Sequence, residues 1–192
     1  MLLRNDSHVS QFGLSCCVAL LLVGCGGIAT LDNTNDAGSA ASGGLRAGSY
    51  VLSLSFWGEP RTPFMFDAKL DVSSNLMTIT LQALAAADRL TPVGQQSTAG
   101  PFPVLESGLY TAGLVSTLPA EAVPFFPTED AELQFQLEAQ RPTCGLVSGD
   151  LTFVSSIPTD LTGSTYAMLP ADHPDARVNP IIDCAGTHAG PL

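Results

Sequence analysis

Positive charge is scarce in this chain of 192 residues. It has 7 Lys and Arg against 18 Asp and Glu, so its formal net charge is −11 at pH 7. A protein that binds nucleic acid, or that adsorbs on anionic lipid through its surface, needs the opposite balance. The composition therefore argues against both classes of partner. Charged residues of either sign make up only 13% of the chain, which favours a secreted β domain with a polar, weakly charged surface.

Long hydrophobic runs are lacking too. No stretch reaches the roughly 18 consecutive apolar residues of a transmembrane helix. The longest apolar segment, Gly13 to Val23, has the length of the hydrophobic region of a signal peptide, and the small residue Gly24 follows it. The sequence therefore predicts export of the chain rather than a membrane span.

The end of this segment, from Leu22 to Cys25, reads Leu-Val-Gly-Cys and resembles the lipobox of bacterial lipoproteins. The resemblance implies that a signal peptidase removes residues 1–24 and that Cys25, acylated with chains such as palmitate, becomes the new N-terminus. Each buried methylene contributes about 0.8 kcal/mol, so two or three acyl chains would hold the protein permanently on a membrane. Gly26 stands where inner-membrane lipoproteins often carry Asp, which implies the outer membrane and leaves its face open.

Cysteine is rare as well, with five residues in the chain. Two lie inside the predicted signal peptide and Cys25 is taken by lipid, so Cys144 and Cys184 remain. Outside the cytoplasm such an isolated pair predicts a disulfide, for which only one connectivity exists. The bridge would close a loop of about 40 residues and, in the chain-entropy model, stabilise the fold by roughly 4 kcal/mol. Metal or redox chemistry, the alternative, uses closer cysteine spacing.

Composition divides the mature chain into three parts. Residues 25–48 contain mostly Gly, Ala, Ser, Asn and Asp, so we expect the lipidated N-terminus to continue as a flexible linker. Residues 49–169 hold the apolar periodicity and predict the folded domain. Residues 170–192 are rich in proline, and we expect a tail that the disulfide alone tethers, without fixed structure beyond Ala185.

Apolar and polar residues alternate in the predicted domain with the period of two that is typical of half-buried strands. Turn residues rich in Gly, Pro, Ser and Asn separate the alternating stretches. Serial hairpins of this kind predict an all-β fold, an antiparallel meander of about seven strands closed as a small barrel, with a β-sandwich as the alternative. The expected strands are 50–57, 64–72, 77–83, 108–118, 131–139, 146–154 and 164–169.

Motifs that carry catalysis or hold a cofactor are missing from the sequence. It has no phosphate-binding loop, no zinc-binding helix and no nucleophile elbow, so we assign no catalytic residue, no metal and no cofactor. The densest polar set lies in the tail, where a solvated surface explains it more simply than a metal site. Its members are Asp172, His173, Asp175, Asp183 and His188.

Paired carboxylates leave one catalytic alternative open. A hydrolase of envelope polymers would need two carboxyl groups that face each other across a cleft, as acid and base. The acidic residues that alternate or cluster along the predicted strands are Asp67, Asp71, Glu129, Asp130 and Glu132.

Aromatic residues in loops carry the binding hypothesis. Trp57 precedes a Gly-Glu-Pro turn, and Phe125 and Phe126 lie between two prolines. Such residues either form a contact patch or close the end of the barrel. Taken together, the sequence predicts a lipid-anchored cell-envelope protein with a non-catalytic binding or structural β domain. Its partner would be an envelope protein, a glycan or a small apolar ligand.

Overall fold

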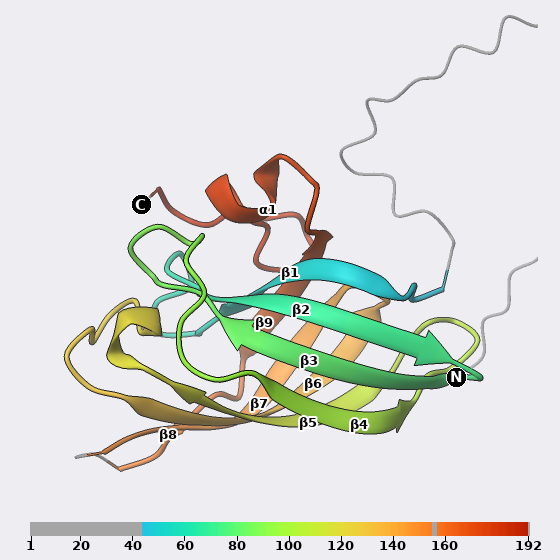
Figure 1. Cartoon of the computed structure of the whole chain (residues 1–192), viewed down its shortest axis with the longest axis horizontal. Coiled ribbons are helices and arrows are strands. Elements are labelled where there is room, and N and C mark those ends of the chain that lie inside the picture. The colour runs from blue at the N-terminus through green and yellow to red at the C-terminus, as the bar shows by residue number, and fades with distance from the viewer. Residues whose placement is uncertain (1–43, 155–156, 192) are drawn as a thin grey trace, which may run out of the picture. The chain divides into compact units, whose positions relative to one another are not determined.

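A computed structural model describes residues 44–154 and 157–191. Within them, nine antiparallel strands form one sheet that curls into a nearly closed barrel (Figure 1). The hydrogen-bonded order is β4-β3-β2-β1-β9-β7-β6-β5, and β8 pairs with β7. The elements are β1 (Gly48–Ser55), β2 (Phe64–Ser73), β3 (Leu76–Ala83), β4 (Ser97–Pro103), β5 (Thr111–Leu118), η1 (Ala120–Ala122), β6 (Ala131–Arg141), β7 (Cys144–Phe153), β8 (Thr159–Asp160), β9 (Ser164–Pro170) and α1 (Asp175–Val178). The predicted all-β barrel is confirmed.

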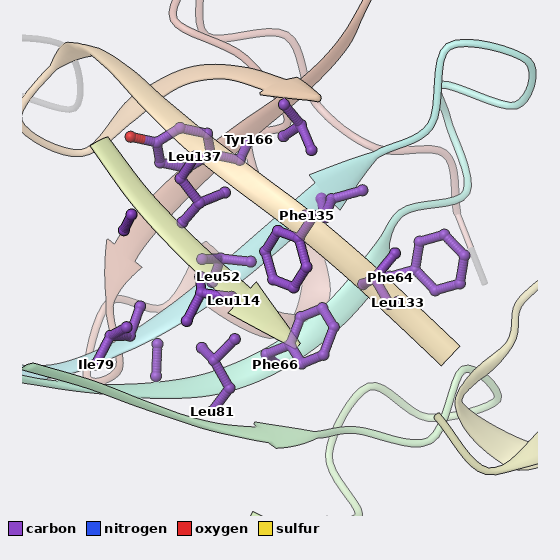
Figure 2. Packing of buried hydrophobic residues seen from close by; sticks show 14 of the residues in the cluster. Leu52, Phe64, Phe66, Ile79, Leu81, Leu114, Leu133, Phe135, Leu137 and Tyr166 are labelled. Carbon is purple, nitrogen blue, oxygen red and sulfur yellow. The ribbon is translucent and has the colours of Figure 1, made fainter. Parts of the chain in front are cut away.

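The barrel interior is filled by the apolar side chains that the alternation predicted (Figure 2). In β6, for example, Leu133, Phe135 and Leu137 are buried while the residues between them are exposed. Phe135 stacks on Phe66 of β2 across the barrel, with ring centroids 6.4 Å apart. Because these residues come from opposite walls, their contact holds the two sides of the sheet together.

A tyrosine pair is the polar feature of this interior. The Tyr166 hydroxyl donates a hydrogen bond to the Tyr110 hydroxyl at 2.9 Å. Burial raises the pKa of both side chains, since a phenolate would lose its hydration there. The pair therefore stays neutral, and the Tyr110 oxygen gives the buried Tyr166 hydroxyl an acceptor for its proton.

Strand β4 was missed by the pattern, as was the short β8. The stretch Ser97–Pro103 contains Pro101 and Pro103, and proline cannot donate to a strand ladder. The structure accommodates both because β4 ends the hydrogen-bonded order, as β5 does at the other end. An isolated bridge between Val104 and Tyr110 joins the two edge strands. The expected strand 108–118 accordingly begins only at Thr111.

The predicted boundaries of the linker and the tail need correction. Leu45 is 9% exposed and packs into the core, so fixed structure begins before residue 49. The tail is held by more than the Cys144–Cys184 disulfide, which is present. The Gly190 N–H donates to the Arg61 carbonyl at 2.8 Å, so the expectation of no fixed structure beyond Ala185 is wrong. Isolated apolar residues and backbone contacts of this kind leave no periodic signal.

The predicted signal peptide, the lipobox from Leu22 to Cys25 and most of the linker lie outside the described residues. Within residues 44–154 and 157–191, no helix has the length and apolar character needed to cross a membrane.

Candidate functional site

One end of the barrel collects the loops that the sequence analysis singled out. The connections that follow β1, β3, β5 and β7 all lie there, because every second connection of an antiparallel meander returns to the same end. We call it the loop end. It brings together segments that are up to a hundred residues apart in the chain.

A row of aromatic rings crosses the loop end. Phe56 lies 5.2 Å from Trp57 and 5.6 Å from Phe125, measured between ring centroids. Phe125 continues to Phe126 at 5.7 Å, and Phe126 reaches Phe153 of β7 at 5.4 Å. We call these five residues the aromatic row. Contacts between tilted or edge-on rings at such distances contribute about 0.5–1.5 kcal/mol each beyond burial, so the row is a connected structure.

Trp57 is fixed at one end of the row although the residue is 57% exposed. Its indole N–H donates to the Asp160 carbonyl at 2.9 Å, and its backbone N–H donates to the Ser164 hydroxyl at 3.1 Å. Hydrogen bonds from the backbone N–H and side chain of Thr162 lower the pKa of the Asp160 carboxyl. The loop that holds the indole is thus itself hydrogen-bonded, and the exposed ring face is presented in a set orientation.

A groove of about 370 Å³ runs along the row. Phe126 on its wall is 58% exposed, and the polar side chains among its lining residues are Glu59 and Thr159. Val154 and Ile157, which are 86% and 87% exposed, belong to the adjoining connection after β7. The lining residues are Phe56, Gly58, Glu59, Phe125, Phe126, Leu151, Phe153 and Thr159.

The three aromatics that the sequence singled out, Trp57, Phe125 and Phe126, therefore lie in one row. Phe125 packs against the core and contacts Phe64 at 5.2 Å, so it closes the barrel end, while the other two stand at the rim. Sequence reasoning missed Phe56 and Phe153. Phe56 neighbours Trp57 in the chain and was available as a signal, whereas Phe153 reads as the last inward residue of a strand.

The carboxylates of the hydrolase alternative are spread over the molecule. Asp67 of β2 accepts a bond from the Arg177 guanidinium at 2.6 Å, and Asp71 lies 3.9 Å from the Lys69 ammonium. Asp130 accepts from the backbone N–H of Ala120 at 2.9 Å. None of the five acidic residues named above is among the residues that line the aromatic groove.

The polar residues of the tail serve local turns. His173 Nδ1 accepts from the Asp175 N–H at 3.2 Å, and His188 Nδ1 bonds with the Asn179 carbonyl at 2.7 Å. Burial raises the pKa of Asp183, but its hydrogen bonds from Thr187 and Ala185 outweigh this and leave the pKa lowered. In the part of the chain that the structure describes, no three His, Cys, Asp or Glu side chains gather as metal ligands would.

No family model, curated protein or solved structure matches this chain. A function therefore has to be inferred from the residues themselves. Of the candidate sites that the sequence suggested, the aromatic residues are the set that the structure brings together, at the aromatic groove.

Proposed function

We propose that this protein is a lipid-anchored cell-envelope protein whose β domain binds a partner protein through the aromatic groove, without catalysis. The observation that carries the proposal is the aromatic row, in which Trp57 and Phe126 are fixed and yet more than half exposed. Rigid aromatic side chains beside a groove are typical anchors of protein interfaces, because they bury a large area at little cost in conformational entropy.

The chemistry of the groove favours a protein over a glycan. A sugar site needs several polar groups that converge on hydroxyls, and this groove offers Glu59 and Thr159 among mostly apolar walls. Val154 and Ile157 extend the apolar surface beyond it, as an interface with another protein requires. Since the chain carries a net charge of −11, the partner's surface is neutral or basic rather than acidic.

The anchor supports the same proposal at a larger scale. If Cys25 carries lipid, the domain stays within reach of the membrane on a linker, which raises its effective concentration toward partners in the same envelope. The hydrolase alternative gains no support from the groove, since Glu59 is the one carboxylate among its lining residues.

A photo-crosslinking amino acid placed at position 126 tests the proposal in cells that produce the full chain. We expect it to capture a defined envelope protein, and the same amino acid at position 115 not to do so. Val115 is a matched control because it is also exposed, at 54%, but lies on β5 outside the groove.

The captured partner is then titrated against purified variants. Phe126→Ala and Trp57→Ala should each weaken binding about tenfold or more, while Val115→Ala leaves the affinity unchanged. Equal affinity for Phe126→Ala and the wild type would contradict the proposal. So would selective binding of a purified envelope glycan that depends on Phe126, since it would replace the protein partner by a sugar.

A further inference from the structure

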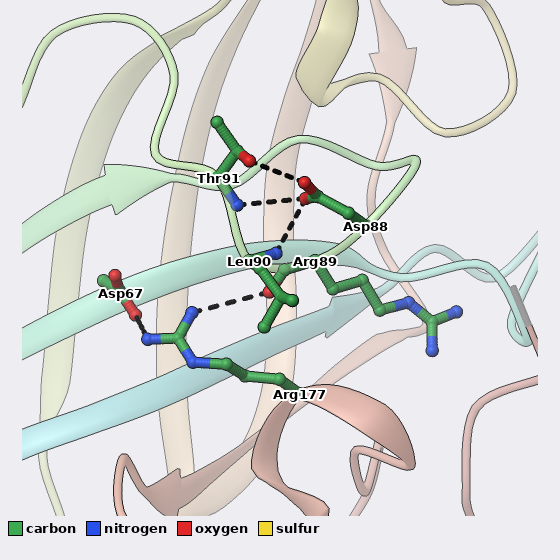
Figure 3. A network of polar contacts seen from close by, with 6 residues as sticks. All are labelled: Asp67, Asp88, Arg89, Leu90, Thr91 and Arg177. Atoms are coloured by element: carbon green, nitrogen blue, oxygen red, sulfur yellow. Dashed lines mark hydrogen bonds and ion pairs between the residues drawn. The ribbon is translucent and has the colours of Figure 1, made fainter.

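A second cavity at the loop end is lined in part by a buried arginine, Arg89. Arg89 lies in the connection after β3 (Figure 3). The preceding residue, Asp88, builds the turn: its Oδ1 accepts from the N–H groups of Leu90 and Thr91 at 2.8 and 3.0 Å. The hydrogen bond from the Thr91 hydroxyl, together with these, lowers the pKa of Asp88 to about 2. Within this turn Arg89 has a φ of 56°, a left-handed conformation that is uncommon for a residue with a long side chain. The turn therefore fixes where the guanidinium is placed.

The guanidinium of Arg89 is incompletely satisfied. The residue is 3% exposed, and its Nη2 donates to the Gly190 carbonyl at 3.1 Å. Its Nη1 is buried and has no hydrogen-bond partner among the described residues. Burial lowers the pKa of Arg89, but an arginine starts so far above neutrality that it stays charged in proteins. A buried cationic donor without a partner is costly, and native structures rarely keep one without a reason.

Arg177, nearby on α1, has hydrogen-bond partners for both of its terminal nitrogens, in contrast to Arg89. Its Nη2 donates to Asp67 at 2.6 Å, and its Nη1 reaches the Arg89 carbonyl at 3.4 Å (Figure 3). In that view the Arg89 side chain points away from Asp67, so the carboxylate that serves Arg177 does not serve Arg89. The open donor thus belongs to the arginine that borders a cavity.

This cavity, which we call the Arg89 cavity, has a volume of about 550 Å³ and mostly apolar walls. Arg89 is the one cation and Glu121 the one anion among its lining residues. A volume in this range is typical of sites for small organic molecules. The lining residues are Thr62, Pro63, Ala85, Ala86, Ala87, Arg89, Glu121, Val123, Pro124, Pro127 and Pro191.

We infer that the Arg89 cavity is a binding site for a small monocarboxylate with an apolar body, whose carboxylate takes the free donor of Arg89. A guanidinium matches the planar carboxylate in geometry and charge, and the alanine and proline walls receive the apolar part. Glu121 in the wall and the net charge of −11 weigh against an anion with several charges, such as phosphate. We therefore expect the site to prefer a singly charged carboxylate both to its neutral amide and to phosphate.

The Arg89 cavity is separate from the aromatic groove, although the segment from Val123 to Pro127 contributes lining residues to both. Val123, Pro124 and Pro127 line the Arg89 cavity, whereas Phe125 and Phe126 line the groove. Occupancy of one site can thus be tested with the other disabled, and the inference stands independently of the proposed function.

An NMR titration of the full chain with cyclohexanecarboxylate tests the inference, with the neutral cyclohexanecarboxamide and inorganic phosphate as controls. We expect the acid to bind with a dissociation constant of about millimolar and to shift the Arg89 Nε–H signal. The amide and phosphate should bind at least tenfold more weakly. Equal binding of acid and amide, or a stronger response to phosphate, would overturn the inference.

Variants then locate the site. Arg89→Gln should weaken binding of the acid at least tenfold and abolish the rise in Tm that the acid gives the wild type, whereas Arg177→Gln and Phe126→Ala should bind as the wild type does. If Arg89→Gln fails to fold, Ala87→Leu serves instead, because Ala87 is exposed and lines the cavity, so a larger side chain there fills it. Undiminished binding in either folded variant would show that the acid binds elsewhere.

Discussion

At the scale of single residues, substitution is most restricted between β6 and β7, where two glycines of β7 lie against the backbone of β6. A Cβ added at Gly149 would lie 2.2 Å from the Gln134 carbonyl oxygen, and one added at Gly145 would lie 2.0 Å from that of Glu138. Gly149 also has a φ of +120°, which side chains rarely adopt. Because the clash is with backbone, no side-chain rotation relieves it, and the strands would have to separate.

We therefore expect Gly149→Ala to lower the free energy of unfolding by about 2 kcal/mol or more, measured by urea denaturation. Gly113→Ala in β5 is the matched control, since its Cβ would meet nothing within 4 Å. That variant should be neutral or gain up to about 1 kcal/mol, because alanine loses less backbone entropy on folding. Similar losses in both variants would contradict the account of the β6–β7 contact.

Among the elements, the C-terminal tail acts as an outer layer of the barrel. Strand β1 is buried on both faces along most of its length, because the tail covers its outer side. Val51 and Met65 on the outside of the sheet form a second apolar cluster with Leu84 and with Ala176 of α1. The Arg177–Asp67 ion pair and the hydrogen bond that the Thr165 hydroxyl of β9 donates to the Ile182 carbonyl, at 2.7 Å, also attach the tail to the barrel. The disulfide is thus one of several attachments.

The double variant Cys144→Ser with Cys184→Ser distinguishes the contribution of the disulfide from that of the other tail contacts. We expect a loss of roughly 4 kcal/mol in the free energy of unfolding, since a loop of 40 residues is no longer closed in the unfolded chain. The tail should nevertheless remain docked. Hydrogen exchange checks this at the Gly190 amide, whose bond to the Arg61 carbonyl persists. Exchange at the rate of an unstructured peptide while the barrel stays folded would show that the bridge alone holds the tail.

At the scale of the whole molecule, the barrel holds its longer loops at one end, and its sheet is left incompletely closed between β4 and β5. The sheet ends at β4 and β5, which are joined by the isolated bridge at Val104 and Tyr110, and the prolines of β4 prevent a full ladder there. The far connections are short, for example the turn at Ser74 and Asn75 between β2 and β3. The longer loops gather at the other end, where both cavities lie.

The proposed anchoring is a property of the whole chain, and Cys25→Ala tests it. Without the thiol, acylation has no acceptor and cleavage should not follow, so we expect an unmodified precursor that leaves the lipid-anchored membrane fraction. Intact mass and cell fractionation measure both effects. Cys17→Ala is the control, because it changes a cysteine inside the apolar segment and should leave processing intact. A lipidated mature form of Cys25→Ala would contradict the anchor.

Particular residues show which features of the structure the sequence pattern predicts and which it does not. The alternation around Phe135 in β6 predicted which side chains enter the core, because strand periodicity is visible in a few neighbouring residues. Ser97–Pro103 gave no such signal, since its prolines are tolerated only at the edge of a sheet. Arg89 reads as an ordinary loop residue, and its burial under the returning tail at Gly190 depends on contacts a hundred residues away.

Local patterning by itself determined the all-β class and the antiparallel hairpins, because each depends on neighbouring residues. The pairing of Cys144 with Cys184 was predicted from a count that assigns Cys25 to lipid, and the structure contains the bridge. Only the tertiary structure decided that the sheet closes as a barrel, that the aromatic row forms and that Arg89 borders a cavity. The reason is physical. Closure of the sheet brings the loops after β1, β3, β5 and β7 to one end, and contacts between residues so distant in sequence leave no periodic trace in any one of them.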